Sequence, residues 1–142
     1  MTRILLTLAL AASTLAVPAC QERGNFVIEN PYIKPPLGGR DVGSAYMTFV
    51  NRAYDLELVA VTSPETSSIE IHETTRTDDG IARMERLDSL PIPRRGEVVL
   101  EPGGKHLMLF GLTADEAADG ITVTLEFDDG STYELELEPK AE

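Results

Sequence analysis

The sequence predicts a single all-β domain, folded as a Greek-key β-sandwich or small barrel. Short runs rich in Val, Ile, Thr, Tyr, Phe and Leu recur along the chain, and Gly, Pro, Asn or Asp signals separate them about every 8 to 12 residues. We find no long amphipathic helical pattern, internal repeat or low-complexity segment. Removing an export segment of 19 residues from the 142 leaves 123, which suffice for one domain with a substantial core.

Residues 1–19 have the features of an export signal, because Arg3 precedes an apolar run that is too short to span a bilayer. Cys20 is the only cysteine and directly follows Val-Pro-Ala. This arrangement resembles a bacterial lipoprotein box, in which the cysteine becomes the lipid-carrying first residue. Ordinary signal cleavage after Ala19 is the alternative. Both interpretations predict an extracytoplasmic or periplasmic protein, and the first adds a membrane anchor at Cys20.

The rest of the chain divides into a short polar tether, residues 20–25, and a β-domain, residues 26–140. We expect strands at 26–33, 43–50, 55–62, 67–74, 81–87, 97–100, 105–110, 121–127 and 132–138.

Turn-forming residues separate these strands. Asp79-Gly80 and Asp129-Gly130 are typical of β-hairpin turns. Pro102-Gly103-Gly104 predicts a turn that leads directly into the strand at 105–110. Residues 113–119 predict one helical turn, which Gly120 would end.

The composition is strongly acidic, with 12 Lys and Arg against 24 Asp and Glu and a net charge of −12. Such a chain is a poor ligand for nucleic acid or anionic lipid. The sequence also lacks Gly-x-Ser-x-Gly, His-Glu-x-x-His and phosphate-loop motifs, and neither Asp-Asp-Gly turn supplies a calcium loop. We therefore expect no enzyme.

The strand at 105–110 contains a histidine and a methionine on the same face. Side chains alternate across a strand, so Leu107 and Leu109 share one face while His106, Met108 and Phe110 share the other. Two leucines mark the first face as the core. His106 and Met108 are therefore predicted to point together toward a rim or the surface.

The second histidine follows the same pattern. In the strand at 67–74, Ile69 and Ile71 form the apolar stripe, and His72 lies on the opposite face. The hairpin turn at Asp79-Gly80 then places Met84 directly opposite His72 or one diagonal step away. Met47, by contrast, alternates with apolar residues and is predicted to lie in the core.

Two imidazoles and two thioethers are a donor set with a specific chemistry. Thioether sulfur is soft and uncharged and prefers Cu(I), whereas zinc sites use cysteine, histidine and carboxylate. A blue-copper centre needs a cysteine thiolate, and the only cysteine lies at the extreme N-terminus. The pattern thus favours a Cu(I) site. The alternative is that these are four unrelated side chains.

The spacing resembles the signature of the periplasmic PCuAC-type copper chaperones. Eleven residues separate His72 from Met84, twenty-one separate Met84 from His106, and one separates His106 from Met108. The family pattern has ten residues in the first interval, and the extra residue here falls in the interval that contains the Asp79-Gly80 turn. The stretches GSAYMTFVN, SSIEIHETT, PGGKHLMLFGL and DGITVTLEFDDG also resemble that family in order and spacing.

This resemblance implies a cupredoxin-like β-fold and one exposed Cu(I) per chain bound by His72, Met84, His106 and Met108. We expect a monomer. It also implies delivery of copper toward the CuA centre of cytochrome c oxidase, alongside Sco-type thiol proteins, and hence a role in cytochrome c oxidase assembly. The C-terminal LELEPKAE contains no His or Met, so we expect no second copper site there. Two other functions fit the same residues: copper storage or resistance, and a structural lipoprotein that binds a protein and no metal.

Overall fold

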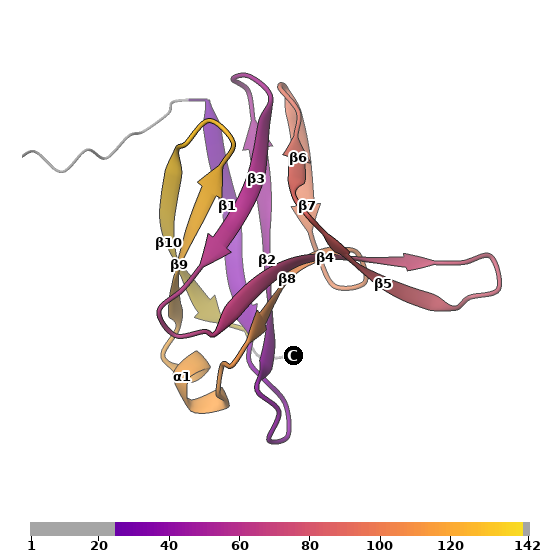
Figure 1. The fold of residues 1–142 in the computed structure, drawn as a ribbon, viewed down its shortest axis with the longest axis vertical. Coiled ribbons are helices and arrows are strands. Elements are labelled where there is room, and N and C mark those ends of the chain that lie inside the picture. Colours follow the sequence, from indigo (N-terminus) through magenta and orange to yellow (C-terminus); the bar gives the residue numbers. More distant parts are fainter. Residues whose placement is uncertain (1–24, 141–142) are drawn as a thin grey trace, which may run out of the picture.

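The computed structural model describes residues 25–140, which form ten strands and one short helix (Figure 1). In chain order these are β1 (Phe26–Lys34), β2 (Val42–Asn51), β3 (Leu56–Thr62), β4 (Ser68–Arg76), β5 (Ala82–Leu87), β6 (Leu90–Ile92), β7 (Gly96–Leu100), β8 (Lys105–Phe110), α1 (Ala114–Ala118), β9 (Ile121–Phe127) and β10 (Thr132–Pro139). The predicted all-β class is confirmed. Every predicted strand is present, with ends that differ by at most two residues.

The sequence did not predict β6, because it is three residues long and has Pro91 at its centre. Proline has no N–H for a sheet ladder and therefore argues against a strand in an interior position. The structure tolerates Pro91 because β6 is the last strand of the sheet, where one side of its backbone needs no partner. The predicted helical turn is α1, which begins with a capping box between Thr113 and Glu116.

All ten strands belong to one sheet, in the order β5-β4-β8-β7-β2-β1-β10-β9-β3-β6. The sheet folds over on itself into a nearly closed mixed barrel, or sandwich (Figure 1). β7 and β8 both pair antiparallel with β2, one after the other along its length, and residues 101–104 form an excursion between them. β8 therefore continues along β2 the ladder that β7 forms, and the other edge of β8 pairs with β4.

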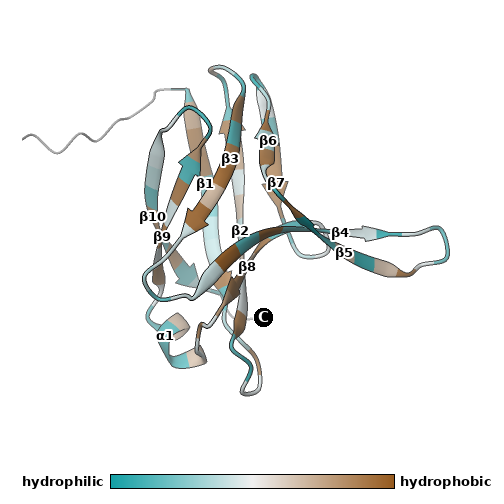
Figure 2. Cartoon of the chain, viewed as in Figure 1, coloured by the Kyte–Doolittle hydropathy of each residue, from teal (hydrophilic) through white to brown (hydrophobic). Residues whose placement is uncertain are grey.

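The buried hydrophobic residues form one continuous core inside the folded sheet. Its largest fully buried side chains include Phe49, Phe127, Leu107 and Leu109, and Figure 2 shows hydrophobic residues along β3, β6 and β8. The predicted core face of β8 is thus confirmed. Met47 is 2 % exposed, which confirms its predicted place in the core.

One part of the molecule extends away from this core. The outer halves of β4 and β5 form a hairpin that projects from the barrel (Figure 1), and every residue of β5 except Leu87 is exposed. Thr77 and Gly80 close the hairpin with a turn in which Gly80 has φ of 79°. Within residues 25–140 no helix is long and apolar enough to cross a membrane.

Candidate metal centre

The two histidines of the chain face each other across neighbouring strands. His72 on β4 is the direct antiparallel partner of His106 on β8, and their ring centroids lie 5.9 Å apart. Directly opposed residues project from the same side of a sheet. Both rings therefore project from the outer face of the sheet, opposite to the core face that carries Leu107 and Leu109, as predicted.

His106 is more enclosed than we expected from the sequence. The predicted face is correct, because the ring projects from the outer face of the sheet. The predicted exposure is wrong, because His106 is only 5 % exposed. The rings of His72 and Tyr46 flank it, the latter with a centroid distance of 6.4 Å. Alternation along one strand gives the face but does not reveal neighbours that cover it.

The orientation of His72 is set by a carboxylate. Its Nε2 lies 2.8 Å from Oε2 of Glu70, and Arg86 lies 3.3 Å from the other carboxylate oxygen. An ionised carboxylate only accepts, so Nε2 carries the proton and donates it. In the neutral imidazole Nδ1 is then unprotonated, and it is buried without a hydrogen-bond partner. A buried nitrogen with a free lone pair costs free energy unless something binds it.

The orientation of His106 is set by a main-chain carbonyl. Its Nδ1 lies 3.0 Å from the carbonyl oxygen of Gly104, which can only accept, so Nδ1–H is the donor and Nε2 keeps its lone pair. The same carbonyl accepts the N–H of Thr74 at 3.0 Å. The excursion at 101–104 thus ties β4 and β8 together beside the histidine pair.

The spacing of the two rings is compatible with both of them binding one metal ion. With a metal–nitrogen bond of about 2.0 Å, two imidazoles on one ion have centroids at most about 6.4 Å apart. The observed 5.9 Å lies within this limit. In the neutral form of each ring, the nitrogen that is not hydrogen-bonded to Glu70 or Gly104 has a free lone pair and can bind a metal. Metal-binding histidines commonly have such an outer partner, which sets the tautomer of the ring.

Met108 lies next to this pair. It is two residues from His106 on the same face of β8, and its direct partners are Glu70 on β4 and Ser44 on β2. The residue is partly buried. The thioether sulfur of Met108 is therefore a third possible metal ligand on the outer face, beside the two histidine nitrogens.

Met84 lies on the other side of His72. The register pairs Thr74 with Met84 and His72 with Arg86, so Met84 is one diagonal step from His72, the second of the two predicted positions. It is 52 % exposed and belongs to the projecting hairpin. Because Met84 and Met108 lie on opposite diagonals of His72, the structure brings together His72, His106 and Met108 and leaves Met84 apart.

Two residues that matter here were not predicted as part of the site. Glu70 holds His72, and Gly104 holds His106. Glu70 has a signal in the sequence, because it is two residues from His72 and so shares its face. Gly104 has none, since only the tertiary structure brings its carbonyl to the ring. Cys20 lies outside the described residues.

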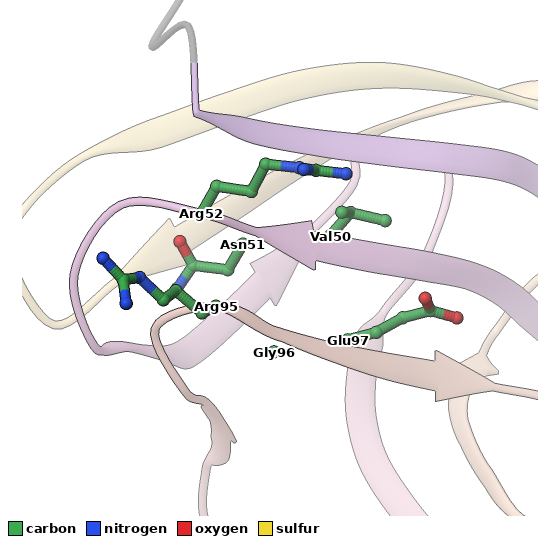
Figure 3. A pocket seen from close by; sticks show the side chains of 6 residues that line it. All are labelled: Val50, Asn51, Arg52, Arg95, Gly96 and Glu97. Atoms are coloured by element: carbon green, nitrogen blue, oxygen red, sulfur yellow. The ribbon is translucent and has the colours of Figure 1, made fainter.

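Two further observations concern possible sites elsewhere in the described domain. Among residues 25–140 no three His, Cys, Asp or Glu side chains are grouped so that they could hold a metal ion. A surface pocket of about 480 Å³ lies far along β2, lined by Val50, Asn51, Arg52, Arg95, Gly96 and Glu97. Figure 3 shows the Arg52 and Arg95 side chains extending in different directions, so the two cations do not converge on a ligand.

The fold is that of the PCuAC domains, as the similarity to their solved structures shows. The copper-bound PCuAC domain from PmoF2 is similar with a TM-score of 0.69 and 25 % identity, over 84 % of this chain and 95 % of that one. The CuI-DR1885 protein from Deinococcus radiodurans is similar with a TM-score of 0.64 and 28 % identity, over 87 % of this chain and 86 % of that one.

The chain belongs to the LpqE-like family, described as "Putative lipoprotein LpqE-like", whose model matches residues 26–138. The protein "Putative lipoprotein Lxx21020" of Leifsonia xyli subsp. xyli is 42 % identical over 76 residues, which are 53 % of this chain and 46 % of that one. The chain spans about half the length of the curated relatives it matches.

Proposed function

We propose that this chain is an extracytoplasmic, non-enzymatic copper chaperone that carries one Cu(I). The observation that carries the proposal is the opposed pair His72 and His106, in which each ring has one nitrogen fixed by a neighbour and one nitrogen free. The copper named in the titles of the similar PCuAC and DR1885 structures supports the choice of metal.

The ligand set in this proposal is His72, His106, Met108 and Met84. The first three lie close together on the outer face. Met84 would join them when the projecting hairpin bends toward β8, because the register leaves it one diagonal step beyond His72. Neutral nitrogens and thioethers favour Cu(I) over harder ions, and the described domain offers no acidic cluster that would attract those ions.

A site built this way suits transfer of copper to another protein. Met84 is exposed at the edge of the sheet, while the histidines are held from behind by Glu70 and Gly104. An incoming ligand from an acceptor can then replace the exposed thioether first, while the enclosed nitrogens keep the ion. We propose that the acceptor is the CuA subunit of cytochrome c oxidase, together with Sco-type proteins.

The test is a competitive Cu(I) titration of the chain from Gln21 onward, under reducing and anaerobic conditions. We expect one tight equivalent, and we expect the double variant His106→Ala/Met108→Leu to lose it. An absence of specific binding by the unaltered chain would overturn the proposal and favour a structural lipoprotein. Transfer of the bound ion to an isolated CuA domain separates delivery from storage, because a storage protein would retain it.

We also propose lipidation at Cys20, which the membership in a lipoprotein family supports. Mass spectrometry of the protein from its native membrane should find the mature chain beginning at Cys20 with an added lipid mass. A product that begins at an unmodified Cys20 and stays in the aqueous fraction would contradict this.

A further inference from the structure

The strand β5 is a free edge of the sheet, and it differs from the edge at the other end. The order of the ten strands begins with β5 and ends with β6. β6 has three residues, and its central Pro91 removes one backbone donor, which are two common ways to prevent edge-to-edge pairing. β5 has six residues and no proline. It therefore keeps a full row of donors and acceptors on its outer side.

The backbone of Met84 lies at the centre of this row. The N–H of Thr77 donates to the carbonyl of Ile81, and hydrogen-bonded pairs alternate along an antiparallel ladder. The register then places residues 83, 85 and 87 in the pairs that bond to β4. The N–H and C=O groups of Ala82, Met84 and Arg86 consequently point outward, away from every strand of the described domain.

The side chains of this segment are complementary to themselves when a second copy is aligned antiparallel and centred on Met84. In that alignment Met84 faces Met84 of the second copy, and Arg83 faces Glu85 on both sides of the centre. One position further, Ala82 faces Arg86, and Ile81 faces Leu87. The segment Ile-Ala-Arg-Met-Glu-Arg-Leu therefore pairs Arg83 with Glu85 and apolar with apolar residues, and the pair of Ala82 with Arg86 brings no like charges together.

These side chains are accessible for such pairing. Ile81 is 58 % exposed and Met84 is 52 % exposed, both high values for large apolar residues. Arg83 and Glu85 are exposed, and within residues 25–140 neither forms an ion pair. The direct partner of Glu85 on β4 is Glu73, a like charge that is already bound to Lys105 at 2.7 Å. Within residues 25–140, Glu85 therefore has no ion-pair partner in the single chain.

We propose that β5 pairs with β5 of a second copy of this chain, antiparallel and centred on Met84, to form a two-fold dimer. The outward N–H and C=O groups of Ala82, Met84 and Arg86 would form the new ladder. Arg83 of each copy would meet Glu85 of the other at the closer, non-hydrogen-bonded positions. Charged side chains usually protect an edge, but here their signs are opposite at the positions that meet.

The second copy is the occupant that these observations favour. A two-fold interface requires a surface that complements itself, and β5 meets this requirement because Arg83 faces Glu85 on both sides of the centre and no like charges are opposed. The hairpin projects from the barrel, which leaves room for a second hairpin beside it (Figure 1). The proposed dimer does not require copper, and it differs from the monomer expected from the sequence.

The test is sedimentation velocity of the copper-free chain from Gln21 onward, which contains the whole described domain. We expect a concentration-dependent dimer. Arg83→Glu alone and Glu85→Arg alone should each raise the dissociation constant at least about tenfold, because each creates like-charge contacts. The double variant Arg83→Glu/Glu85→Arg should restore the dimer. A mixture of the two single variants should form a mixed dimer, since their altered charges are complementary.

Cross-linking tests the register. Met84→Cys should form a disulfide or react with a short bifunctional thiol reagent, because the two positions meet at the two-fold axis. Arg86→Cys alone should not, whereas it should cross-link when mixed with Ala82→Cys. A chain that stays monomeric at high concentration, or a dimer that is indifferent to both charge reversals, would overturn the proposal. The proposal would also be overturned if Met84→Cys alone and Arg86→Cys alone cross-linked equally well.

Discussion

His72 and His106 lie directly opposite each other on β4 and β8, with ring centroids 5.9 Å apart. One nitrogen of each ring is fixed by a hydrogen bond, to Glu70 for His72 and to the carbonyl of Gly104 for His106. Positions 72 and 106 are far apart in the chain, so the pair exists only because these two strands are adjacent.

Met108→Leu should lose most of the affinity for Cu(I), because a thioether is replaced by an apolar side chain of similar size. Met47→Leu is the matched control, since Met47 is buried in the core and a swap of similar volume costs less than about 1.5 kcal/mol of stability. Competitive titration of both variants decides the matter. If Met47→Leu lost copper while Met108→Leu kept it, the assignment of the outer face would be wrong.

Glu70→Gln should weaken Cu(I) binding by about 10- to 100-fold, because the carboxylate no longer holds the proton on Nε2 of His72. Nitrogen chemical shifts of His72 should report a change of tautomer in the copper-free protein. Glu73→Gln is the control, because Glu73 lies on the opposite face of the same strand and pairs with Lys105. Equal effects of the two substitutions would show that only the net charge matters.

Met84→Leu should weaken Cu(I) binding less than Met108→Leu does. Met84 is exposed and lies on the far side of β4 from His106 and Met108, so its sulfur must be brought toward them by a bend of the hairpin. Addition of Cu(I) should accordingly shift the amide resonances of β5 and the turn at Thr77–Gly80. Unchanged resonances in this hairpin, with full affinity in Met84→Leu, would remove Met84 from the ligand set.

Gly111→Ala should destabilise the domain by more than Gly103→Ala. Both glycines have positive φ, of 71° and 83°, so an alanine at either site is strained by about 1 kcal/mol. A Cβ at Gly111 would also lie 2.5 Å from Oγ of Ser67, whereas a Cβ at Gly103 meets nothing within 4 Å. Urea denaturation of the two variants measures the clash alone as their difference. Equal stabilities would mean that the loop at Ser67 yields without cost.

Glu116 should titrate below its usual pKa of 4.5, because the side chain and the backbone N–H of Thr113 both donate to its ionised carboxylate. A pKa lowered by folding stabilises the folded state above the unfolded pKa, and this contribution is lost as pH falls through the folded value. In Thr113→Val the pKa should move back toward 4.5, as followed by carboxyl carbon shifts. The melting temperatures of the two proteins should converge as the pH falls below that range, and a constant gap would contradict the assignment.

The sequence by itself determined the features that depend on local periodicity. Alternation placed Leu107 and Leu109 on the core face of β8 and His106 and Met108 on the other, and the same rule separated Ile71 from His72. Turn residues set the strand ends, because Gly and Pro act through their own dihedral angles. The chemical nature of the donors, nitrogen and soft sulfur, is likewise a property of the residues.

Only the tertiary structure decided which strands are neighbours. That β4 lies beside β8, that the carbonyl of Gly104 reaches His106, and that β5 is left at a free edge all follow from the packing of the whole sheet. Pairing between distant segments is set by the burial of a shared core, and no short stretch of sequence encodes it. Met84 lies one diagonal step from His72, as the sequence predicted, but only the order of the strands shows that Met108 lies on the opposite diagonal.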